Sequence, residues 1–559
     1  MLRSRLHRIL YFVFVFAILS SCGIKRSIRD RPDLSGFDDT LPTRNQVNDS
    51  CFRTGNDRLL KNSFGQWELY ISGDPLQRGL KTGLMTKELL EKQESYFFSN
   101  VTDIIPSKSK QALLRRFLAY FNRKMYRYID NEFKAEIYGL SQYAGHDYDY
   151  LADPYMRILY LHGAHDIGHA VQGLALVGCT SFAVWDDHSA DGKLLLGRNF
   201  DFYAGDDFAK EKVIAFIDPE RGNSFMSVTW AGMMGVVSGM NEKGMTVTIN
   251  AGHSKIPFSA KTPISILTRE ILQYASNLDE ALAIAKTRRL FVSESIMVGS
   301  ATDHKAIIIE VSPDKLDVYE VQNTGELICS NHFQSELLAD QKENKEHMEE
   351  SHSVYRYERM TELLAENKKV DPLIAAEILR TRTGLQDKAI GNGNEKSLNQ
   401  LLAHHSVIFQ PEDLKVWVSS NPYQLGEYVA YDLHDIFNVD HTAGPNITSA
   451  NTLLTIPEDP FLHSQEFSDY EQYRRLRRIL LKSLEDESEL ANPGILEELT
   501  QLNPEYYEAY YLVALYQQEH DSLKKALTNF KTAASKEVTT LDEKEDIAKR
   551  IKKLERKLK

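Results

Sequence analysis

The sequence predicts an α+β fold in which sheets pack in layers against helices. Short runs rich in β-branched and aromatic residues dominate residues 179–455, and they include "TSFAVW", "FMSVTW", "MTVTIN" and "KAIIIEV". Helical blocks interrupt these runs at about residues 263–287, 354–366 and 372–382. Strand runs on both sides of a helical block favour a layered α+β arrangement, and longer helical stretches precede and follow this part of the chain.

Length and composition limit the classes of function. With 559 residues, of which 42% are hydrophobic and 26% charged, the chain can bury a large core and is long enough for more than one domain. The formal net charge is -13. Because an acidic surface repels polyanions, we expect no nucleic acid among the partners of this protein.

The first 22 residues have the pattern of an export signal. Arginines at positions 3, 5 and 8 precede an apolar run at residues 9–19, which is too short to span a bilayer comfortably. The following "LSSC" resembles a bacterial lipobox, which implies cleavage before Cys22 and lipid on its thiol. We therefore expect an exported protein anchored to a bacterial membrane, facing the periplasm or the surface. An ordinary secretory signal and an uncleaved anchor are the alternatives.

The chain has four cysteines, so a lipidated Cys22 leaves three. An odd set of thiols in an oxidising compartment leaves at least one unpaired. A bridge between Cys51 and Cys329 is compatible with the sequence, although nothing in the spacing requires it. Cys179 is the thiol that most needs an explanation, and the simplest one is that a free cysteine fills apolar space.

The last part of the chain, residues 465–559, is helical and resembles one tetratricopeptide helix pair, through Tyr510, Ala514, Ala526, Phe530 and Ala533. One such pair cannot bury both its faces, so it should pack on neighbouring helices or on a protein partner. The final segment has an apolar stripe beneath many lysines, formed by Ile547, Ile551, Leu554 and Leu558. Contact with an anionic membrane and a simple closing role are both open for it.

Three histidines form a competing candidate site. His162, His165 and His169 fall at i, i+3 and i+7, which places three imidazoles on one helix face. Imidazole is a common zinc ligand, but groups two turns apart on one helix rarely surround one ion, and no HExxH pattern supplies a general base. We expect a structural role and no bound metal or cofactor, and keep a histidine-metal hydrolase as an alternative.

Cys179 follows Gly178 at the start of a strand. Cleavage between them would put a thiol and an α-amine on one residue. The amine has an ordinary pKa of about 7.7 to 8.0, so it can accept the thiol proton near neutral pH. This is the arrangement of an N-terminal nucleophile.

Several motifs in consistent order carry a family resemblance. They are "GDPLQRGLKTG" before the cysteine, "GCTSFAVW" and "DGKLLLGRNFDF" around it, and then "GMNEKGMTVTIN", "ICSNHFQ", "SVYRYERMTELL" and "HHSVIFQPEDLKVWVSSNP". Together they resemble the acyl-coenzyme A:6-aminopenicillanic acid acyltransferase family, which is related to choloylglycine hydrolases and penicillin V acylases. The resemblance covers residues 66–435.

The resemblance implies a four-layered αββα N-terminal nucleophile hydrolase fold. The expected organisation is a lipoprotein signal at 1–22, a polar tether at 23–65, a helical propeptide-derived region at 66–178, the hydrolase core at 179–455 and the helical tail at 465–559. The signal and the tail lie outside the resemblance.

The same resemblance implies that Cys179 is the nucleophile, with Arg198 and Asp201 beside it. Asp201 would hold the α-amine by a charge-assisted hydrogen bond, and Arg198 would favour the thiolate. Residues three apart on a strand point to opposite faces, so both serve one site only if the strand bends or ends there. Taken alone, each residue would more often form an ordinary salt bridge.

Three further positions match the family. Asn331 matches its oxyanion-stabilising asparagine, whose amide can lower a transition state by about 3 to 4 kcal/mol, and Asn250 is a second polar contact. Arg356 matches an arginine near the site, although Arg359 one turn later competes with it.

The function implied is cleavage of a linear acyl amide in a small molecule, through a thioester on Cys179, without a cofactor. Attack on the thioester by water or by an amine would give hydrolysis or acyl transfer, and both remain open. A non-enzymatic lipoprotein that binds a partner through its helical tail is the alternative from another class.

Overall fold

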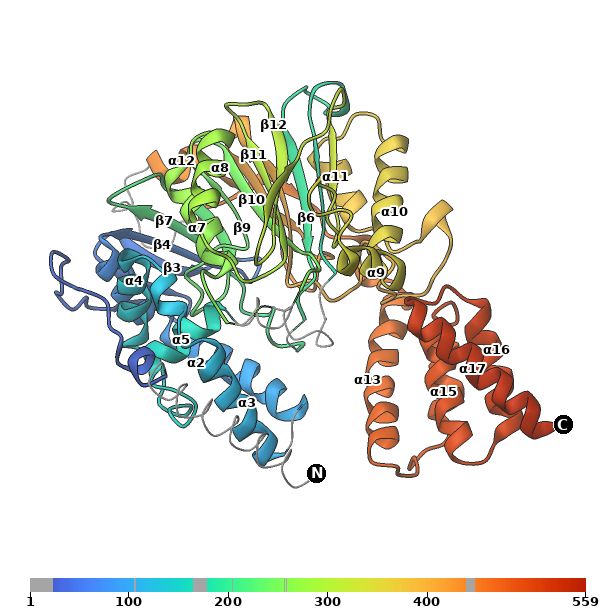
Figure 1. The fold of residues 1–559 in the computed structure, drawn as a ribbon. Helices are drawn as coiled ribbons and strands as arrows, with labels where there is room; N and C mark the ends of the chain where they lie inside the picture. The colour runs from blue at the N-terminus through green and yellow to red at the C-terminus, as the bar shows by residue number, and fades with distance from the viewer. Residues whose placement is uncertain are drawn as a thin grey trace, which may run out of the picture.

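The computed structural model describes residues 24–104, 107–163, 178–203, 205–255, 257, 259–438 and 448–559. Within these residues two sheets pack face to face, and helices cover the outer face of each (Figure 1). The order is therefore helix, sheet, sheet, helix, which confirms the predicted αββα arrangement.

The first sheet has the strand order β1-β2-β3-β4-β7-β8-β9-β10-β11-β12-β13. Its neighbours are antiparallel except β4 and β7, which run parallel. The strands are β1 Asn45–Asn48, β2 Cys51–Thr54, β3 Asp57–Lys61, β4 Trp67–Gly73, β7 Val213–Pro219, β8 Phe225–Thr229, β9 Ser238–Asn241, β10 Met245–Ala251, β11 Glu294–Ser300, β12 Lys305–Val311 and β13 Leu316–Tyr319.

The second sheet has the order β14-β5-β6-β15-β16-β17-β18, and all its neighbours are antiparallel. Its strands are β14 Glu326–Cys329, β5 Thr180–Val184, β6 Leu195–Phe200, β15 His405–Gln410, β16 Lys415–Ser419, β17 Tyr428–Asp432 and β18 Ala450–Ile456. Apolar side chains from both sheets, among them Phe216, Met240, Val407 and Phe409, fill the space between them.

Helices on the first sheet come mainly from the chain before Cys179 and from the middle of the core (Figure 1). They are α2 Pro75–Ile104, α3 Lys108–Phe121, α4 Asn131–Ser141, α5 Pro154–His162, α7 Ile264–Tyr274 and α8 Leu278–Thr287. Helices α10 Ser353–Glu366 and α11 Pro372–Leu379 cover the second sheet. Helix α9 Lys342–Glu350 lies beside α10, and the short helix α12 Leu433–Asn438 follows β17. None of the described helices has the length and apolar character that a membrane crossing requires.

Residues 45–61 of the region predicted as a polar tether instead form strands of the first sheet. Strands β1, β2 and β3 lie within residues 23–65, and β4 follows at once and joins the sheet beside β7. The strands are short, and tight turns with left-handed glycines at Gly55 and Gly65 connect them. Because turn residues dominate the local composition, the short runs between them could not be recognised as strands from the sequence. The chain before Cys179 thus contributes strands to the first sheet as well as helices.

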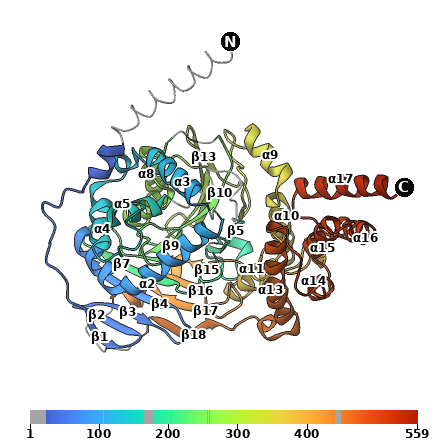
Figure 2. The ribbon, with the colours of Figure 1, turned by 90° about the horizontal axis from the view of Figure 1, so that it is seen from below.

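The final part of the chain forms its own helical layer with a separate apolar core (Figure 2). Its helices are α13 Gln465–Glu485, α14 Ile495–Leu502, α15 Tyr507–Glu519, α16 Leu523–Ser535 and α17 Leu541–Leu558. Helices α15 and α16 form the antiparallel pair predicted from the repeat pattern. Ile547 and Leu554 of the apolar stripe are buried in this core and Ile551 packs against it, so these three residues serve the closing role, whereas Leu558 is exposed.

The helical tail contacts the core through the loop at residues 388–396. Lys388 and Lys396 both pair with Glu537, at 2.9 and 2.6 Å. Gly391 has a φ of +84°, and a β-carbon there would lie 2.4 Å from the backbone of Tyr506. Only glycine fits such a close approach, so the backbone of this loop packs directly against the backbone of the tail at Tyr506.

The disulfide left open by the sequence is not formed. Cys51 lies in β2 of the first sheet, and Cys329 ends β14 of the second. Both remain buried thiols, as does Cys179.

Candidate active site

Cys179 lies directly before β5, in the interior of the second sheet, and its side chain is fully buried. Thr180 pairs with Asn199 and Ser181 with Arg198, so Cys179 stands level with the last residue of β6. On the other side β5 pairs with β14, which ends at Cys329. This register brings the start of β5 next to the last residues of β6 and β14, at one end of the strands.

Arg198 of β6 reaches across from the second sheet to the first. One terminal nitrogen, Nη1, donates to the carbonyl of Val237 at 2.7 Å and also to Ser238. The other, Nη2, donates to the carbonyl of Ile249 and lies 3.7 Å from the Cys179 sulfur. Burial raises the pKa of Cys179 to about 11, while the positive charge of Arg198 acts in the opposite direction. In the continuous chain the sulfur is therefore a thiol held beside a fixed cation.

Asp201 reaches the same site because β6 ends at Phe200. Along the strand Arg198 faces the first sheet, and Asn199 faces the opposite side, where it bonds to Leu379 and Leu398. Once the strand stops, Asp201 no longer follows this alternation. Its backbone carbonyl accepts a hydrogen bond of 3.3 Å from Gly178, so Asp201 and the Gly178–Cys179 peptide are joined.

The carboxylate of Asp201 is fully buried, and neither of its oxygens has a hydrogen-bond partner in the part of the chain that the structure describes. Burial raises the pKa of Asp201 to about 7, and the charges of Arg356 and Arg198 oppose this shift. A buried polar group without a partner costs free energy and needs an explanation. An amine that forms at Cys179 would provide one, since it would supply the missing donors.

Arg356 of α10 binds the backbone at Cys179 itself. Its Nη1 donates to the carbonyl oxygen of Cys179 at 2.7 Å and to the hydroxyl of Thr180, and its Nη2 donates to the side-chain oxygen of Asn331 at 2.6 Å. Arg359, the competing residue, is turned elsewhere and pairs with Glu362 and Asp387. The structure thus brings Arg356, and not Arg359, to the site.

The two asparagines lie on neighbouring segments of the site. Asn331 follows β14, and its Nδ2 donates to the carbonyl of Ala251 at 3.0 Å. An amide nitrogen carries two hydrogens, so Asn331 has a second one for a developing oxyanion. Asn250 of β10 donates to the carbonyl of Cys329 at 3.1 Å and accepts from Ser181 at 2.8 Å. Asn250 therefore ties β10 to the ends of β5 and β14.

The three histidines are only partly described. His162, at the end of α5, is fully buried, and both its ring nitrogens are engaged, with the carbonyl of Ile158 and the amide of Met234, each at 2.9 Å. Burial lowers the pKa of His162 to about 4. A neutral ring held by two backbone groups is a packing residue. His165 and His169 lie outside the described residues, as does Cys22.

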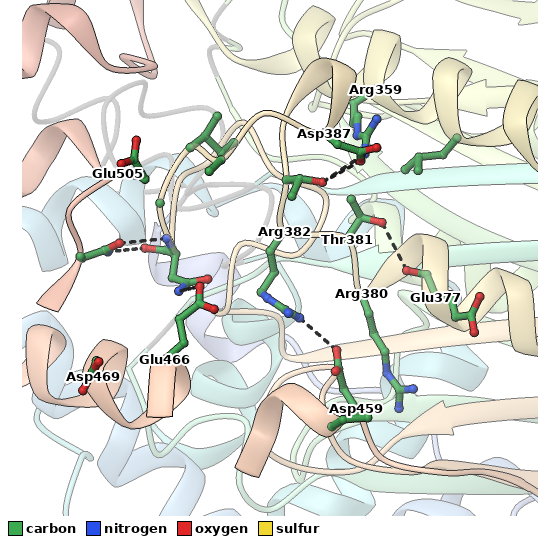
Figure 3. A pocket seen from close by; sticks show the side chains of 18 of the residues that line it. Arg359, Glu377, Arg380, Thr381, Arg382, Asp387, Asp459, Glu466, Asp469 and Glu505 are labelled. Atoms are coloured by element: carbon green, nitrogen blue, oxygen red, sulfur yellow. Dashed lines mark hydrogen bonds and ion pairs between the residues drawn. The ribbon is translucent and has the colours of Figure 1, made fainter. Parts of the chain in front are cut away.

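A pocket of about 900 Å³ lies away from Cys179, where the loop after α11 meets the start of the helical tail. Figure 3 shows Arg382 directed at Asp459, with which it forms an ion pair of 3.0 Å, and Arg359 beside Asp387. Cys179 does not line this pocket. The cavity belongs to the contact between core and tail.

One contact at the site escaped the sequence analysis. The side-chain amide of Gln400 donates to the carbonyl oxygen of Gly178 at 3.0 Å. These residues are 222 positions apart, and Gln400 lies in a loop before β15 without any recognisable motif. No local pattern in the sequence could have indicated it.

Residues 188–422 match the model of the acyl-coenzyme A:6-aminopenicillanic acid acyl-transferase family. This part of the chain is similar to that family. The match includes Arg198, Asp201, Asn250, Asn331 and Arg356, and it begins nine residues after Cys179.

Two curated relatives are similar to about half of this chain. An uncharacterized protein of Archaeoglobus fulgidus is 27% identical over 45% of the chain and 45% of its own length. Protein dcd1B of Dictyostelium discoideum is 21% identical over 49% of the chain and 55% of its own length. The chain thus spans about half the length of these relatives.

Two solved structures are similar at a low level. An N-acylethanolamine-hydrolyzing acid amidase ortholog of Caenorhabditis elegans has a TM-score of 0.31 at 18% identity, over 42% of this chain and 93% of its own. A mutant of the conjugated bile acid hydrolase of Clostridium perfringens has a TM-score of 0.32 at 15% identity, over 49% of this chain and 96% of its own.

Proposed function

We propose that this protein is a cysteine N-terminal nucleophile enzyme that cleaves its own chain before Cys179 and then transfers acyl groups from linear amides through a thioester on that cysteine. The observation that carries the proposal is the setting of the Gly178–Cys179 peptide. The Cys179 thiol lies beside Arg198, and the carbonyls of Gly178 and Cys179 accept hydrogen bonds from Gln400 and Arg356. The backbone of Asp201 is bonded to Gly178, and its buried carboxylate has no partner among the described residues.

Self-cleavage begins at the thiol. The Cys179 sulfur loses its proton and attacks the carbonyl carbon of Gly178, and the carbon–nitrogen bond breaks while the nitrogen takes up a proton. The product is a thioester between Gly178 and the Cys179 side chain. Water then hydrolyses this thioester, which leaves a carboxylate on Gly178 and a free amine on Cys179. We assign the proton transfer of the first step to Asp201, because burial raises its pKa to about 7 and its charge acts on the Cys179 thiol.

Turnover uses the amine released by self-cleavage. The amine accepts the thiol proton, and the sulfur attacks the carbonyl carbon of a bound amide. The developing oxyanion is stabilised by the second amide hydrogen of Asn331, which Arg356 holds in place at 2.6 Å. The amine then donates its proton to the leaving nitrogen. Asp201 orients the amine throughout by a charge-assisted hydrogen bond.

The substrate class is tested with linear acyl amides that differ in acyl length and in the amine they release. We expect the purified protein to release amine from at least one of them, because the acyl-enzyme forms on Cys179. Adding a second amine separates the two outcomes, since acyl transfer yields a new amide where hydrolysis yields a free acid. Amine release that a chelator abolishes would support the histidine-metal alternative and overturn this proposal.

We also propose that Cys22 carries lipid and anchors the protein to a bacterial membrane. The support is the "LSSC" sequence that ends the apolar run of the leader. Replacing Cys22 with serine is expected to move the protein from the membrane fraction to the soluble fraction, because the lipid is lost. Membrane association that persists in this variant, after cleavage of the leader at another bond, would contradict the anchor.

A further inference from the structure

We propose that Gln400 is a catalytic residue of self-cleavage, whose side-chain amide stabilises the negative charge that develops on the carbonyl oxygen of Gly178. This role rests on the proposed cleavage before Cys179. It assigns the oxyanion donor of the intramolecular step to a residue of the loop before β15, separate from Asn331, which serves external substrates.

The contact is direct and buried. The Gln400 nitrogen lies 3.0 Å from the Gly178 oxygen, and Gln400 is 2% exposed. A β-carbon on Gly178 would lie 2.4 Å from the same nitrogen, so the glutamine amide occupies the space that any larger residue would need. Glycine at position 178 thus lets the donor approach its acceptor closely.

The loop that carries Gln400 is fixed on both sides. The side chain of Asn399 accepts from the backbone of Leu401 at 3.0 Å, and its backbone donates to Thr381 at 2.8 Å. Asn199 of β6 donates to the carbonyl of Leu398 at 2.9 Å. The strand that presents Arg198 to the thiol therefore also positions the loop that presents Gln400 to the carbonyl. Because the donor is already in place, little reorganisation is needed when charge develops.

The chemistry of the first step needs such a donor. Attack by the sulfur turns the Gly178 carbonyl carbon tetrahedral and puts a negative charge on its oxygen. In a buried site that charge lacks water, so a missing donor costs far more than it would at the surface. The other contacts of the bond cannot replace Gln400, since Arg356 binds the carbonyl of the next residue, Cys179. The amide of Gly178 in turn donates to Asp201.

The test follows the first-order rate of cleavage of freshly made full-length protein by intact mass. Replacing Gln400 with leucine is expected to slow cleavage by about 100- to 1,000-fold, the usual loss when one oxyanion donor is removed. Gln424 provides the matched control, because it is a buried glutamine whose amide faces the carbonyl of Leu379 instead, at 3.5 Å. Gln424→Leu is expected to cleave at the wild-type rate.

A second variant separates charge stabilisation from packing. In Gln400→Glu the shape is kept, but an ionised carboxylate would face the oxyanion, whereas its protonated form donates a hydrogen bond again. The cleavage rate of this variant is expected to approach the wild-type rate as the pH falls from about 8 to about 5. Burial raises the pKa of such a carboxyl group above its ordinary value of about 4.3, so the group becomes protonated in this range. A purely structural role would give a constant ratio of rates.

The outcomes discriminate between this role and the proposed function. If the wild type cleaves and Gln400→Leu cleaves at the same rate, the role of Gln400 is overturned and self-cleavage stands. The same holds if the ratio of the Gln400→Glu rate to the wild-type rate does not change with pH. Wild-type protein that never cleaves overturns the proposed self-cleavage and this role with it.

Discussion

Replacing Cys179 with alanine is expected to leave the protein as one uncut chain without amide-cleaving activity. The variant lacks the sulfur that attacks Gly178, so the peptide bond stays intact and no α-amine forms at position 179. It also lacks the nucleophile for external amides, so both losses should be complete rather than partial. Intact mass and the release of amine from an acyl amide measure the two effects on the same sample.

Cys329 is the matched control for this experiment. It is also a buried thiol, and it ends β14, the strand that pairs with β5. Cys329→Ala removes a sulfur of the same size from the same region but should still cleave and turn over. Loss of cleavage in both variants would point to a general packing defect. Normal turnover in Cys179→Ala would refute the assignment of the nucleophile.

Replacing Arg356 with lysine is expected to lower the rate of amide cleavage by at least about 100-fold. The guanidinium group bonds to the carbonyl of Cys179, to Thr180 and to Asn331 at once, and a lysine ammonium cannot reproduce this planar set of contacts. Each hydrogen bond to a charged group contributes about 1.5 to 3 kcal/mol, so losing the geometry of two of them accounts for this factor. The rate per correctly cleaved chain is the quantity to measure.

Arg359→Lys provides the control one turn along the same helix. Arg359 is as deeply buried as Arg356, but its partners are Glu362 and Asp387, away from the thiol. The control is expected to lose some stability and to keep its rate per cleaved chain. Equal loss of rate in the two variants would contradict the assignment of Arg356 to the site.

Many strands of the core were predictable because they are continuous runs of apolar and β-branched residues. Runs such as "KAIIIEV" and "MTVTIN" are apolar enough to appear as β12 and β10 without other information. The strands at residues 45–61 were not predictable in this way, because four- and five-residue strands with arginine, asparagine and aspartate resemble a solvated linker. β1 is exposed, and the burial of β2 and β3 depends on pairing within the first sheet, which no local pattern encodes.

The residues of the site also differ in how far the sequence predicts them. Cys179, Arg198 and Asp201 could be proposed together because they lie within one hairpin and within one recognisable run of sequence. The sequence showed that Arg198 and Asp201 could share a site only if the strand bent or ended between them. It did not show that β6 ends at Phe200. Gln400 could not be proposed, since its contact with Gly178 arises from the pairing of β6 with β15 and from a loop held by distant backbone groups.

The most direct measurement of the central claim is N-terminal sequencing, together with intact mass, of wild-type protein that has been shown to release amine from an acyl amide. The account predicts two associated chains, of which one begins at Cys179. The cleavage rate should be independent of protein concentration, because the attacking sulfur belongs to the same chain as the bond. Active protein in which the Gly178–Cys179 bond is intact would contradict the account, since the amide nitrogen of an uncut Cys179 cannot accept a proton from its thiol.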